Sequence, residues 1–288
     1  VVRCVPCAVS PEEATLIGPQ DYVLVATKAH QLSQAVPVVA ALCGPETRVV
    51  PLQNGLPFWF FHNFGGQLAG STVRAVDPDG MIGQALQPER VVGCTSFVAG
   101  AVEGDYNRWL SKWPASKSTL TFGEISKADA PRRNTVHGLA KLFGGDTQLP
   151  LGINISEDIR CAVLEKIMVN ASVNPLATLA RADCAQLCSS PGLVRALRAV
   201  CAEVETVASL LDVKLSQSAD AILKRYSGQQ GLKASMLQDL EAGRPLERAA
   251  ILDALVELGV MLRVETPTLD MLSALLEMLE ATQLNPSH

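Results

Sequence analysis

The sequence predicts an α/β domain followed by an all-helical domain. In the first half, short β-branched runs alternate with a helical pattern, as in sheets whose parallel strands are joined by crossover helices. From about Ser156 onward the strand patterns end and helical periodicity continues. We therefore expect a first domain over residues 1–155 and a second over residues 156–288.

The elements of the first domain follow in order along the chain. The expected strands are VVRCVPCAV (1–9), DYVLVATKA (21–29) and ETRVVPLQNG (46–55), with the helix-like QLSQAVPVVAALC (31–43) before the last of them. Glycine-punctuated strands between residues 91 and 124 suit the antiparallel edge of a mixed sheet. Residues 57–90, which begin with PFWFF, leave the sheet, and we expect them to shape the substrate end of the site or a subunit contact.

The second domain is expected to be helical throughout. Ser156 is the expected N-cap of its first helix, because an acidic first turn and an apolar run follow it. The other helical patterns are those of residues 189–211, 233–243, 248–262 and 266–281. An α/β half followed by a helical half predicts a ligand cleft between the two.

Composition narrows the class of partner. The 288 residues are 48% hydrophobic and 18% charged, which indicates a filled aliphatic core and excludes disorder. A net charge of −5 gives no electrostatic footprint for nucleic acid or an anionic membrane, so we expect a small-molecule ligand. The sequence shows neither a membrane-length apolar run nor a signal-peptide pattern, which predicts a cytoplasmic protein.

The eight cysteines raise the possibility of a metal or disulfide site. Cys4 and Cys7 form a CxxC with no second copy, and Cys184 and Cys188 are one helical turn apart. The four histidines show no ligand spacing. We therefore expect no metal and interpret the thiols as buried or idle.

Polar side chains recur at every fourth position of an apolar helix pattern. Lys166, Asn170 and Asn174 form one narrow stripe among neighbours such as Ile167 and Val173. A lysine desolvated among buried asparagines has its charged form disfavoured, which suits a proton donor. The stripe alone is equally compatible with the rim of a hydrophobic core.

Further polar residues stand at the ends of predicted strands, where open α/β sheets bind ligands. Lys28 and Gln31 follow the strand DYVLVAT, and Asn54 follows RVVPLQ with a glycine after it. Farther on, Ser235 and Glu247 are a hydroxyl that could bind an anion and a carboxylate that could orient a lysine. Taken singly, each of these is also compatible with an ordinary turn or an exposed surface position.

Five segments taken together identify a family. VATKAHQL, LQNGL, LEKIMVNASVNPLATL, KASMLQDLEAGRPLE and VETPTLDML occur in this order. In these segments the sequence resembles the ketopantoate reductase (2-dehydropantoate 2-reductase) family along essentially its whole length.

The resemblance implies a Rossmann-like domain that binds NADPH and a helical domain that closes over a 2-oxo acid, as in pantothenate biosynthesis. By motif position Lys166 resembles the general acid, and Asn170 and Asn174 resemble substrate-binding amides. Ser235 resembles the serine that holds the substrate, and Glu247 the catalytic-site glutamate that holds a substrate hydroxyl and the lysine.

Three further positions are implied to bind the cofactor. Lys28 and Gln31 match cofactor-contacting positions, and Asn54 matches the asparagine where nicotinamide and substrate meet. A homodimer is a further possibility.

The sequence also departs from the family pattern. The glutamate is usually followed by Ile-Asp and shortly by a glycine, whereas Arg248 and Ala249 follow Glu247 here, and Asp253 stands about where the glycine is expected. Residues 58–90 are longer than the usual link. Both departures leave the exact 2-oxo acid open.

The sequence contains no G-x-G-x-x-G turn, the motif that holds the pyrophosphate in dinucleotide-binding domains. We therefore expect the chain to lack the first part of its cofactor domain and to bind NADPH weakly. Two alternatives remain open at this point: another β-hydroxyacid dehydrogenase-like oxidoreductase, or a non-catalytic truncated remnant that acts through association.

Overall fold

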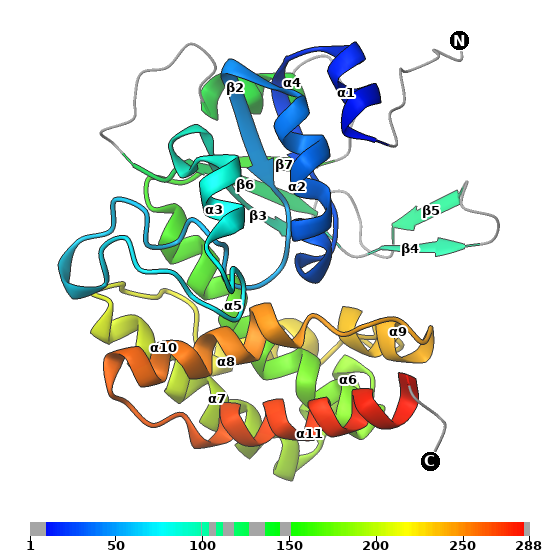
Figure 1. Ribbon diagram of the computed structural model, residues 1–288. Helices are drawn as coiled ribbons and strands as arrows, with labels where there is room; N and C mark the ends of the chain where they lie inside the picture. The colour runs from blue at the N-terminus through cyan, green and yellow to red at the C-terminus, as the bar shows by residue number, and fades with distance from the viewer. Residues whose placement is uncertain are drawn as a thin grey trace. The chain divides into compact units, whose positions relative to one another are not determined.

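The computed structural model describes residues 10–98, 100–103, 108–111, 118–126, 136–144 and 151–284, and these form two compact units (Figure 1). Unit 1 comprises Val1–Gln53, Pro57–Thr72 and Asp77–Ile159, and unit 2 comprises Asn54–Leu56, Val73–Val76 and Arg160–His288. Unit 1 is α/β and unit 2 is helical, which confirms the predicted fold class. Two short segments from the first half of the chain therefore belong to the helical unit.

The sheet of unit 1 begins with a parallel pair. Strand β1 (Gln20–Val25) pairs with β2 (Cys43–Pro51), and Val23 lies opposite Val49. The crossover between them consists of the short 3-10 helix η1 (Ala29–Gln31) and helix α2 (Leu32–Ala41). This is the expected strand-helix-strand unit. The expected strand over residues 1–9 lies outside the described residues.

The sheet continues with strands of mixed direction. An isolated parallel bridge joins Val49 to Val91, directly before strand β3 (Val92–Phe97). Strand β3 is antiparallel to β6 (Thr119–Glu124), and β6 is parallel to β7 (Gly152–Ile155). The antiparallel pair was expected, whereas β7 was not, because four residues are too few to show a clear pattern. Strands β4 (Gly100–Glu103) and β5 (Arg108–Ser111) form a separate antiparallel pair.

Helices pack on this sheet and bury its aliphatic side chains. Helix α2 packs beside α1 (Pro11–Ile17) and α3 (Met81–Leu86), while α4 (Val136–Gly144) packs on β6 and β7. Two 3-10 turns, η2 (Gly66–Leu68) and η3 (Pro88–Arg90), flank α3. Helices α1, α3 and α4 were not predicted from the sequence.

The aromatic start of the long segment after β2 lies inside unit 1. Trp59, Phe60 and Phe61 are each 1% exposed, so these rings are part of the hydrophobic core. A Cβ built at Gly93 would lie 2.7 Å from Ile159 and 3.0 Å from Trp59, so only a glycine lets the sheet approach them so closely. Packing therefore accounts for the PFWFF run.

Unit 2 is built from helices of unequal length. Helix α5 (Ile159–Ala180) is the longest, and a five-residue π turn, η5 (Ala249–Asp253), precedes α10. The remaining helices are α6 (Cys184–Ser189), α7 (Pro191–Leu210), α8 (Ala219–Tyr226), α9 (Ser235–Glu241), α10 (Ala254–Leu262) and α11 (Pro267–Leu284).

The expected N-cap at Ser156 is wrong, because helix α5 begins only at Ile159. The amide of Ser156 still donates to Phe122 O at 2.7 Å, continuing the pairing of β7 with β6. Its hydroxyl accepts from the amide of Asp158 at 3.1 Å. Ser156 thus ends the strand instead of starting the helix.

Candidate active site

Helix α5 carries the predicted stripe in a buried setting. Lys166 is 7% and Asn174 is 6% exposed, and their neighbours Ile167 and Val173 are buried. Asn170 is half-buried. The apolar side chains of α5 pack into unit 2 and bring these polar groups inside with them. Burial of this kind is costly unless each polar group finds a partner.

Two amides of the stripe lack such a partner. Nδ2 of Asn170 and Nδ2 of Asn174 are buried and hydrogen-bonded to nothing among the residues that the structure describes. An unpaired buried N–H costs about 1–3 kcal/mol, and such groups in native proteins call for a functional explanation. Two N–H donors facing a ligand would provide one.

The stripe extends one step beyond the prediction. Thr178 follows Asn174 by four residues and is 0% exposed, and its Oγ1 finds no partner in the described part of the chain. The spacing could have revealed it, but threonine is common enough in helices that the signal is weak. By contrast, the buried Ser172 hydroxyl donates to Met168 O at 2.7 Å.

Asn54 and Glu247 meet although 193 residues separate them: Asn54 Nδ2 donates to Glu247 Oε2 at 3.1 Å. Glu247 is 5% exposed. Both residues belong to unit 2, because residues 54–56 dock on the π turn before α10. The geometry therefore provides a buried carboxylate held by an amide.

Gly55 makes this docking possible. Its φ of +88° is in the region that favours glycine, and a Cβ there would lie 2.3 Å from Ala250 O. The next amide, that of Leu56, donates to the same carbonyl at 2.8 Å. Asn54 is thus placed by a backbone contact that no other residue type would allow.

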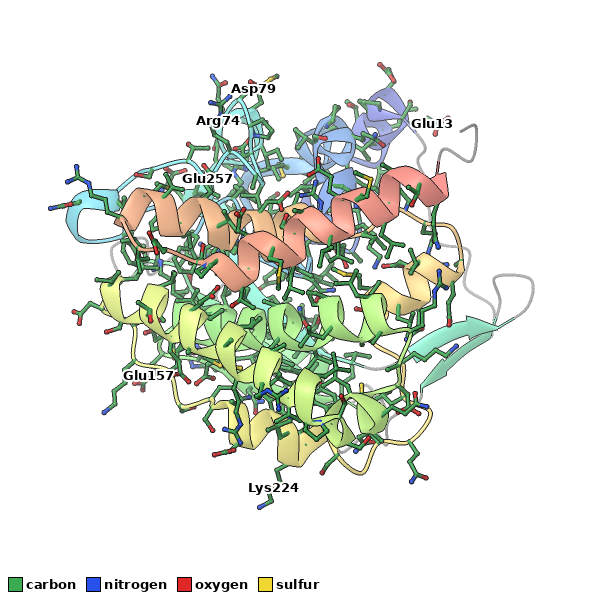
Figure 2. The ribbon with its side chains drawn as sticks, turned by 90° about the horizontal axis from the view of Figure 1, so that it is seen from below. Glu13, Arg74, Asp79, Glu157, Lys224 and Glu257 are labelled. Carbon is green, nitrogen blue, oxygen red and sulfur yellow. The ribbon has the colours of Figure 1, made fainter. Side chains whose placement is uncertain are left out.

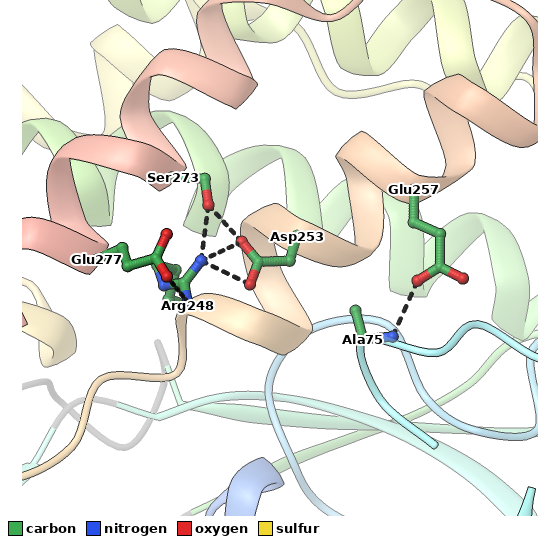
Figure 3. Close-up of polar contacts among 6 residues, drawn as sticks. All are labelled: Ala75, Arg248, Asp253, Glu257, Ser273 and Glu277. Carbon is green, nitrogen blue, oxygen red and sulfur yellow. Dashed lines mark hydrogen bonds and ion pairs between the residues drawn. The ribbon is translucent and has the colours of Figure 1, made fainter. Parts of the chain in front are cut away.

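A second carboxylate binds residues 73–76, a short part of the long segment 57–90, to α10. Glu257 accepts from the backbone amides of Arg74 at 2.8 Å and Ala75 at 2.9 Å. Figure 2 labels Arg74 and Glu257, and Figure 3 shows the bond between Glu257 and the amide of Ala75. Residues 73–76 are for this reason part of unit 2. This contact could not be predicted from the sequence, because neither residue lies in a recognisable motif.

Ser235 is the first residue of the seven-residue helix α9 and is exposed. The structure therefore sets Lys166, Asn170 and Asn174 on one helix and brings Asn54 to Glu247. Ser235 lies on a different helix of the same unit.

The predicted cofactor residues Lys28 and Gln31 lie in unit 1, directly after β1. Gln31 is exposed, and its Oε1 accepts from the amide of Lys28 at 3.1 Å. The bond fixes the turn at the carboxyl end of the strand, where ligands bind in open α/β sheets.

Gln53, which the sequence analysis did not single out, ties the ends of β1 and β2 together. Its Nε2 donates to Val25 O at 3.0 Å and to Thr27 Oγ1 at 3.2 Å. Its Oε1 is buried and unpaired within the described ranges. An unused acceptor near Lys28 fits a ligand that carries N–H or O–H donors, as a nicotinamide nucleotide does. The residues at this strand edge therefore fit such a cofactor.

Of the six cysteines in the described part of the chain, Cys94, Cys184 and Cys201 are buried, and Cys43, Cys161 and Cys188 are half-buried. Burial raises the pKa of Cys184 to about 12, with the charges of Cys188 and Asp183 adding to the effect. Burial also raises the pKa of Cys201 to about 11. Cys4 and Cys7 lie outside the described residues. Within those residues, no group of three or more His, Cys, Asp or Glu side chains could hold a metal ion.

None of the helices in the described part of the chain is both long and apolar enough to span a bilayer.

The chain consists of an α/β unit, whose parallel strands end in residues that fit a nucleotide, followed by a helical unit with a buried lysine and two buried amide nitrogens. This is the architecture of a two-domain dehydrogenase.

Comparison with known proteins identifies the group. Residues 2–57 match the family model described as "Ketopantoate reductase PanE/ApbA", and residues 158–280 match "Ketopantoate reductase PanE/ApbA C terminal". A 2-dehydropantoate 2-reductase from Mesorhizobium japonicum is 36% identical over 268 residues, which cover 93% of this chain and 79% of that protein. The chain belongs to the ketopantoate reductase PanE/ApbA family and is a homologue of NADP-dependent 2-dehydropantoate 2-reductases.

Solved structures agree with this assignment. A protein from Ralstonia solanacearum MolK2 assigned as a ketopantoate reductase is 30% identical with a TM-score of 0.82, covering 94% of this chain and 79% of that one. A dimeric ketopantoate reductase from Staphylococcus aureus shares the fold at 20% identity, with a TM-score of 0.71 over 95% of this chain and 81% of that one.

One expectation from the sequence is not supported. The match to the N-terminal family model begins at residue 2, so the comparison does not support the inference that the first part of the cofactor domain is missing.

Proposed function

We propose that the protein reduces a 2-oxo acid of the ketopantoate type to the 2-hydroxy acid with NADPH, and that Lys166 is the general acid. The observation that supports this most is the buried stripe of α5, in which Lys166 is 7% exposed and the Nδ2 groups of Asn170 and Asn174 are unpaired among the described residues. Such a stripe is costly to an empty protein and useful to one that binds a carbonyl compound.

The reaction needs a hydride at the carbonyl carbon and a proton on its oxygen. Bound NADPH would supply the hydride. Lys166 donates the proton as negative charge builds on the oxygen, and the amides of Asn170 and Asn174 hold the substrate beside it. The product would be the 2-hydroxy acid, with NADPH oxidised to NADP⁺.

The other predicted residues complete the binding of substrate and cofactor. Glu247, held by Asn54, accepts a hydrogen bond from the hydroxyl group of the substrate, and the Ser235 hydroxyl donates a hydrogen bond to the substrate carboxylate. Lys28 and Gln31 contact the cofactor at the carboxyl end of β1. These roles follow from the resemblance, and the pairing of Asn54 with Glu247 at 3.1 Å supports them.

Oxidation of NADPH, followed at 340 nm with ketopantoate as substrate, tests the proposal. The same protein carrying Lys166→Ala, purified in parallel, controls for contaminating host reductase. We expect turnover with the unmodified protein well above that background, and a preference for NADPH over NADH. Equal rates for the two proteins would overturn the proposal.

The relative from Staphylococcus aureus is described as dimeric, and we expect a homodimer here as well. Sedimentation velocity measures this directly.

A further inference from the structure

Directly after Glu247, Arg248 forms a polar cluster with residues of η5 and α11 (Figure 3). Its Nη1 donates to both carboxylate oxygens of Asp253 at 2.7 Å and to Ser273 Oγ at 2.9 Å. The Ser273 hydroxyl in turn donates to Asp253 Oδ1. Glu277 Oε1 lies 4.0 Å from Nη2. The side chains of Arg248 and Asp253 are only 20% and 27% exposed, so solvent screens this pair weakly.

The pair spans five residues, which is the spacing of a π turn. In an α-helix, five steps rotate a side chain by about 500°, leaving the two groups about 140° apart on the helix surface. In the wider π turn, residue i+5 comes back over residue i. The amide of Ala254 accordingly donates to Ala249 O, five residues back. The ion pair and the π turn therefore stabilise each other.

The π turn carries the docking site of the loop that holds Asn54. Ala250, inside the turn, offers its carbonyl to the amide of Leu56 at 2.8 Å and leaves room only for Gly55. If the turn reverted to an α-helix, this carbonyl would move and the loop would lose its hydrogen bond to the turn. Asn54 would then no longer be held against Glu247.

Glu247 is also fixed from both sides along the chain. Before it, the amide of Leu246 donates to Glu280 Oε1 of α11 at 2.8 Å. After it, Arg248 reaches Ser273 of the same helix. The residues on both sides of Glu247 are therefore hydrogen-bonded to α11, which restricts the position of its carboxylate.

We infer that Arg248 is a positioning residue: by pairing with Asp253 it holds the π turn that fixes Glu247 and Asn54, and so sets the preference for 2-oxo acids that carry a hydroxyl group. This inference rests on the proposed function for its effect on substrate choice. Arg248 and Asp253 are two of the three positions at which the sequence departs from the family pattern around the glutamate, and the structure shows them bonded to each other.

The test compares two substrates that differ in one group. Ketopantoate carries a hydroxyl, and 3,3-dimethyl-2-oxobutanoate is the same 2-oxo acid without it. For Arg248→Gln and for Asp253→Asn we expect kcat/KM on ketopantoate to fall roughly 10- to 100-fold, because misplacement of about 1 Å has costs of this order. On the analogue we expect a clearly smaller loss, because displacement of Asn54 affects both acids, whereas displacement of Glu247 adds a loss only where a hydroxyl is present for it to hold. In Arg248→Lys, which keeps the charge but not the planar guanidinium group, kcat/KM on ketopantoate should fall less.

A second readout does not depend on activity. Amide hydrogen exchange should quicken at Leu56 and Ala254 in both variants while amides of α7 keep their protection, because only the π turn and its loop are released. Arg198→Gln is the matched control: it breaks an Arg–Asp pair of 2.5 Å with Asp220 in the same unit but away from Glu247. It should alter neither exchange at Leu56 nor substrate preference.

The double variant Arg248→Gln with Asp253→Asn should be no worse than either single variant, as coupled partners behave. Equal losses on both substrates, or unchanged exchange at Leu56, would overturn the inference. If the unmodified protein reduces neither acid, the proposed function fails, and the exchange measurement alone then decides whether Arg248 holds the turn.

Discussion

The two groups of candidate site residues are held in opposite ways. In unit 1, Gln31 is exposed and its amide oxygen is already bonded to the backbone of Lys28. In unit 2, Lys166, Asn174 and Glu247 are buried, and the Asn174 amide nitrogen has no partner in the described ranges. The contrast teaches that the unpaired Asn174 amide of unit 2 lowers stability unless a ligand pairs with it, whereas Gln31 of unit 1 helps to form the turn in which it lies.

The largest test of this contrast is Lys166→Ala. If the lysine donates the proton, turnover should fall roughly 10²–10⁴-fold while cofactor affinity changes little, because general acid catalysis contributes rate enhancements of that size. Steady-state kinetics and a nicotinamide fluorescence titration measure the two quantities. Lys224→Ala, an exposed lysine of α8 in the same unit (Figure 2), is the control and should leave both unchanged. Unaltered turnover in Lys166→Ala would remove Lys166 from the mechanism.

Gly55→Ala should have the next largest effect. The new Cβ would have to fit 2.3 Å from Ala250 O at a φ of +88°, so the loop must leave the π turn. We expect a fall in kcat/KM of roughly 100-fold, because Asn54 moves with the loop. Circular dichroism and thermal unfolding report whether the fold persists.

Gly231→Ala shows how much of the effect of Gly55→Ala comes from backbone strain and how much from the close contact with Ala250. Gly231 also has a positive φ, +70°, but has nothing within 4 Å of the added carbon. In this variant only the free energy of unfolding should fall, by about 1–2 kcal/mol, because an L-residue is strained in the left-handed region. If both variants lose activity equally, the contact with Ala250 is not what matters.

Asn174→Ala should separate stability from activity. Because the Asn174 Nδ2 makes no bond to the described residues, its removal should leave the melting temperature unchanged or raise it. Loss of one hydrogen bond to the substrate should lower kcat/KM roughly 10- to 100-fold, since bonds to charged groups contribute about 1.5–3 kcal/mol.

Ser172→Ala is the control on the same helix, because the Ser172 hydroxyl is already bonded to Met168 O at 2.7 Å. It should leave kcat/KM as it is. A clear loss of stability in Asn174→Ala would show that the amide serves the fold and not a ligand.

These tests also mark what the sequence can reveal. The stripe on α5 was predictable because four-residue spacing within one helix is a local pattern. The pairing of Asn54 with Glu247 was not, because 193 residues separate them and only tertiary packing joins them. Gln53 was overlooked for a similar reason: its role depends on the distance between two strand ends.

In the fold, too, elements with a local sequence pattern were predicted, and elements that depend on tertiary contacts were not. Strands β1 and β2 are β-branched and were predicted, whereas β7 exists because β6 offers it an edge. The ion pair of Arg248 with Asp253 appeared in the sequence only as two unexplained departures from a pattern. Its meaning depends on the π turn, which has no sequence signature of its own.

The smallest expected effect concerns buried groups of unit 2 that the reaction does not use. Burial raises the pKa of Cys184 to about 12 and that of Cys201 to about 11, whereas an unfolded thiol ionises at about 8.5. Above that pH the unfolded chain loses these protons while the folded chain keeps them. The unfolded state then binds fewer protons, so the free energy of unfolding falls as pH rises, until the folded thiols ionise as well.

Melting temperatures between pH 8 and 11 should therefore decline less steeply in a Cys184→Ala, Cys201→Ala double variant than in the unmodified protein. Some decline should remain, because burial also raises the pKa of Tyr226 to about 12 and so acts in the same direction above the ordinary tyrosine value. Parallel curves would show that the two thiols ionise alike in the folded and unfolded states. A shallower curve with unchanged kcat/KM at pH 8 would show that burial of these two thiols affects stability and not catalysis.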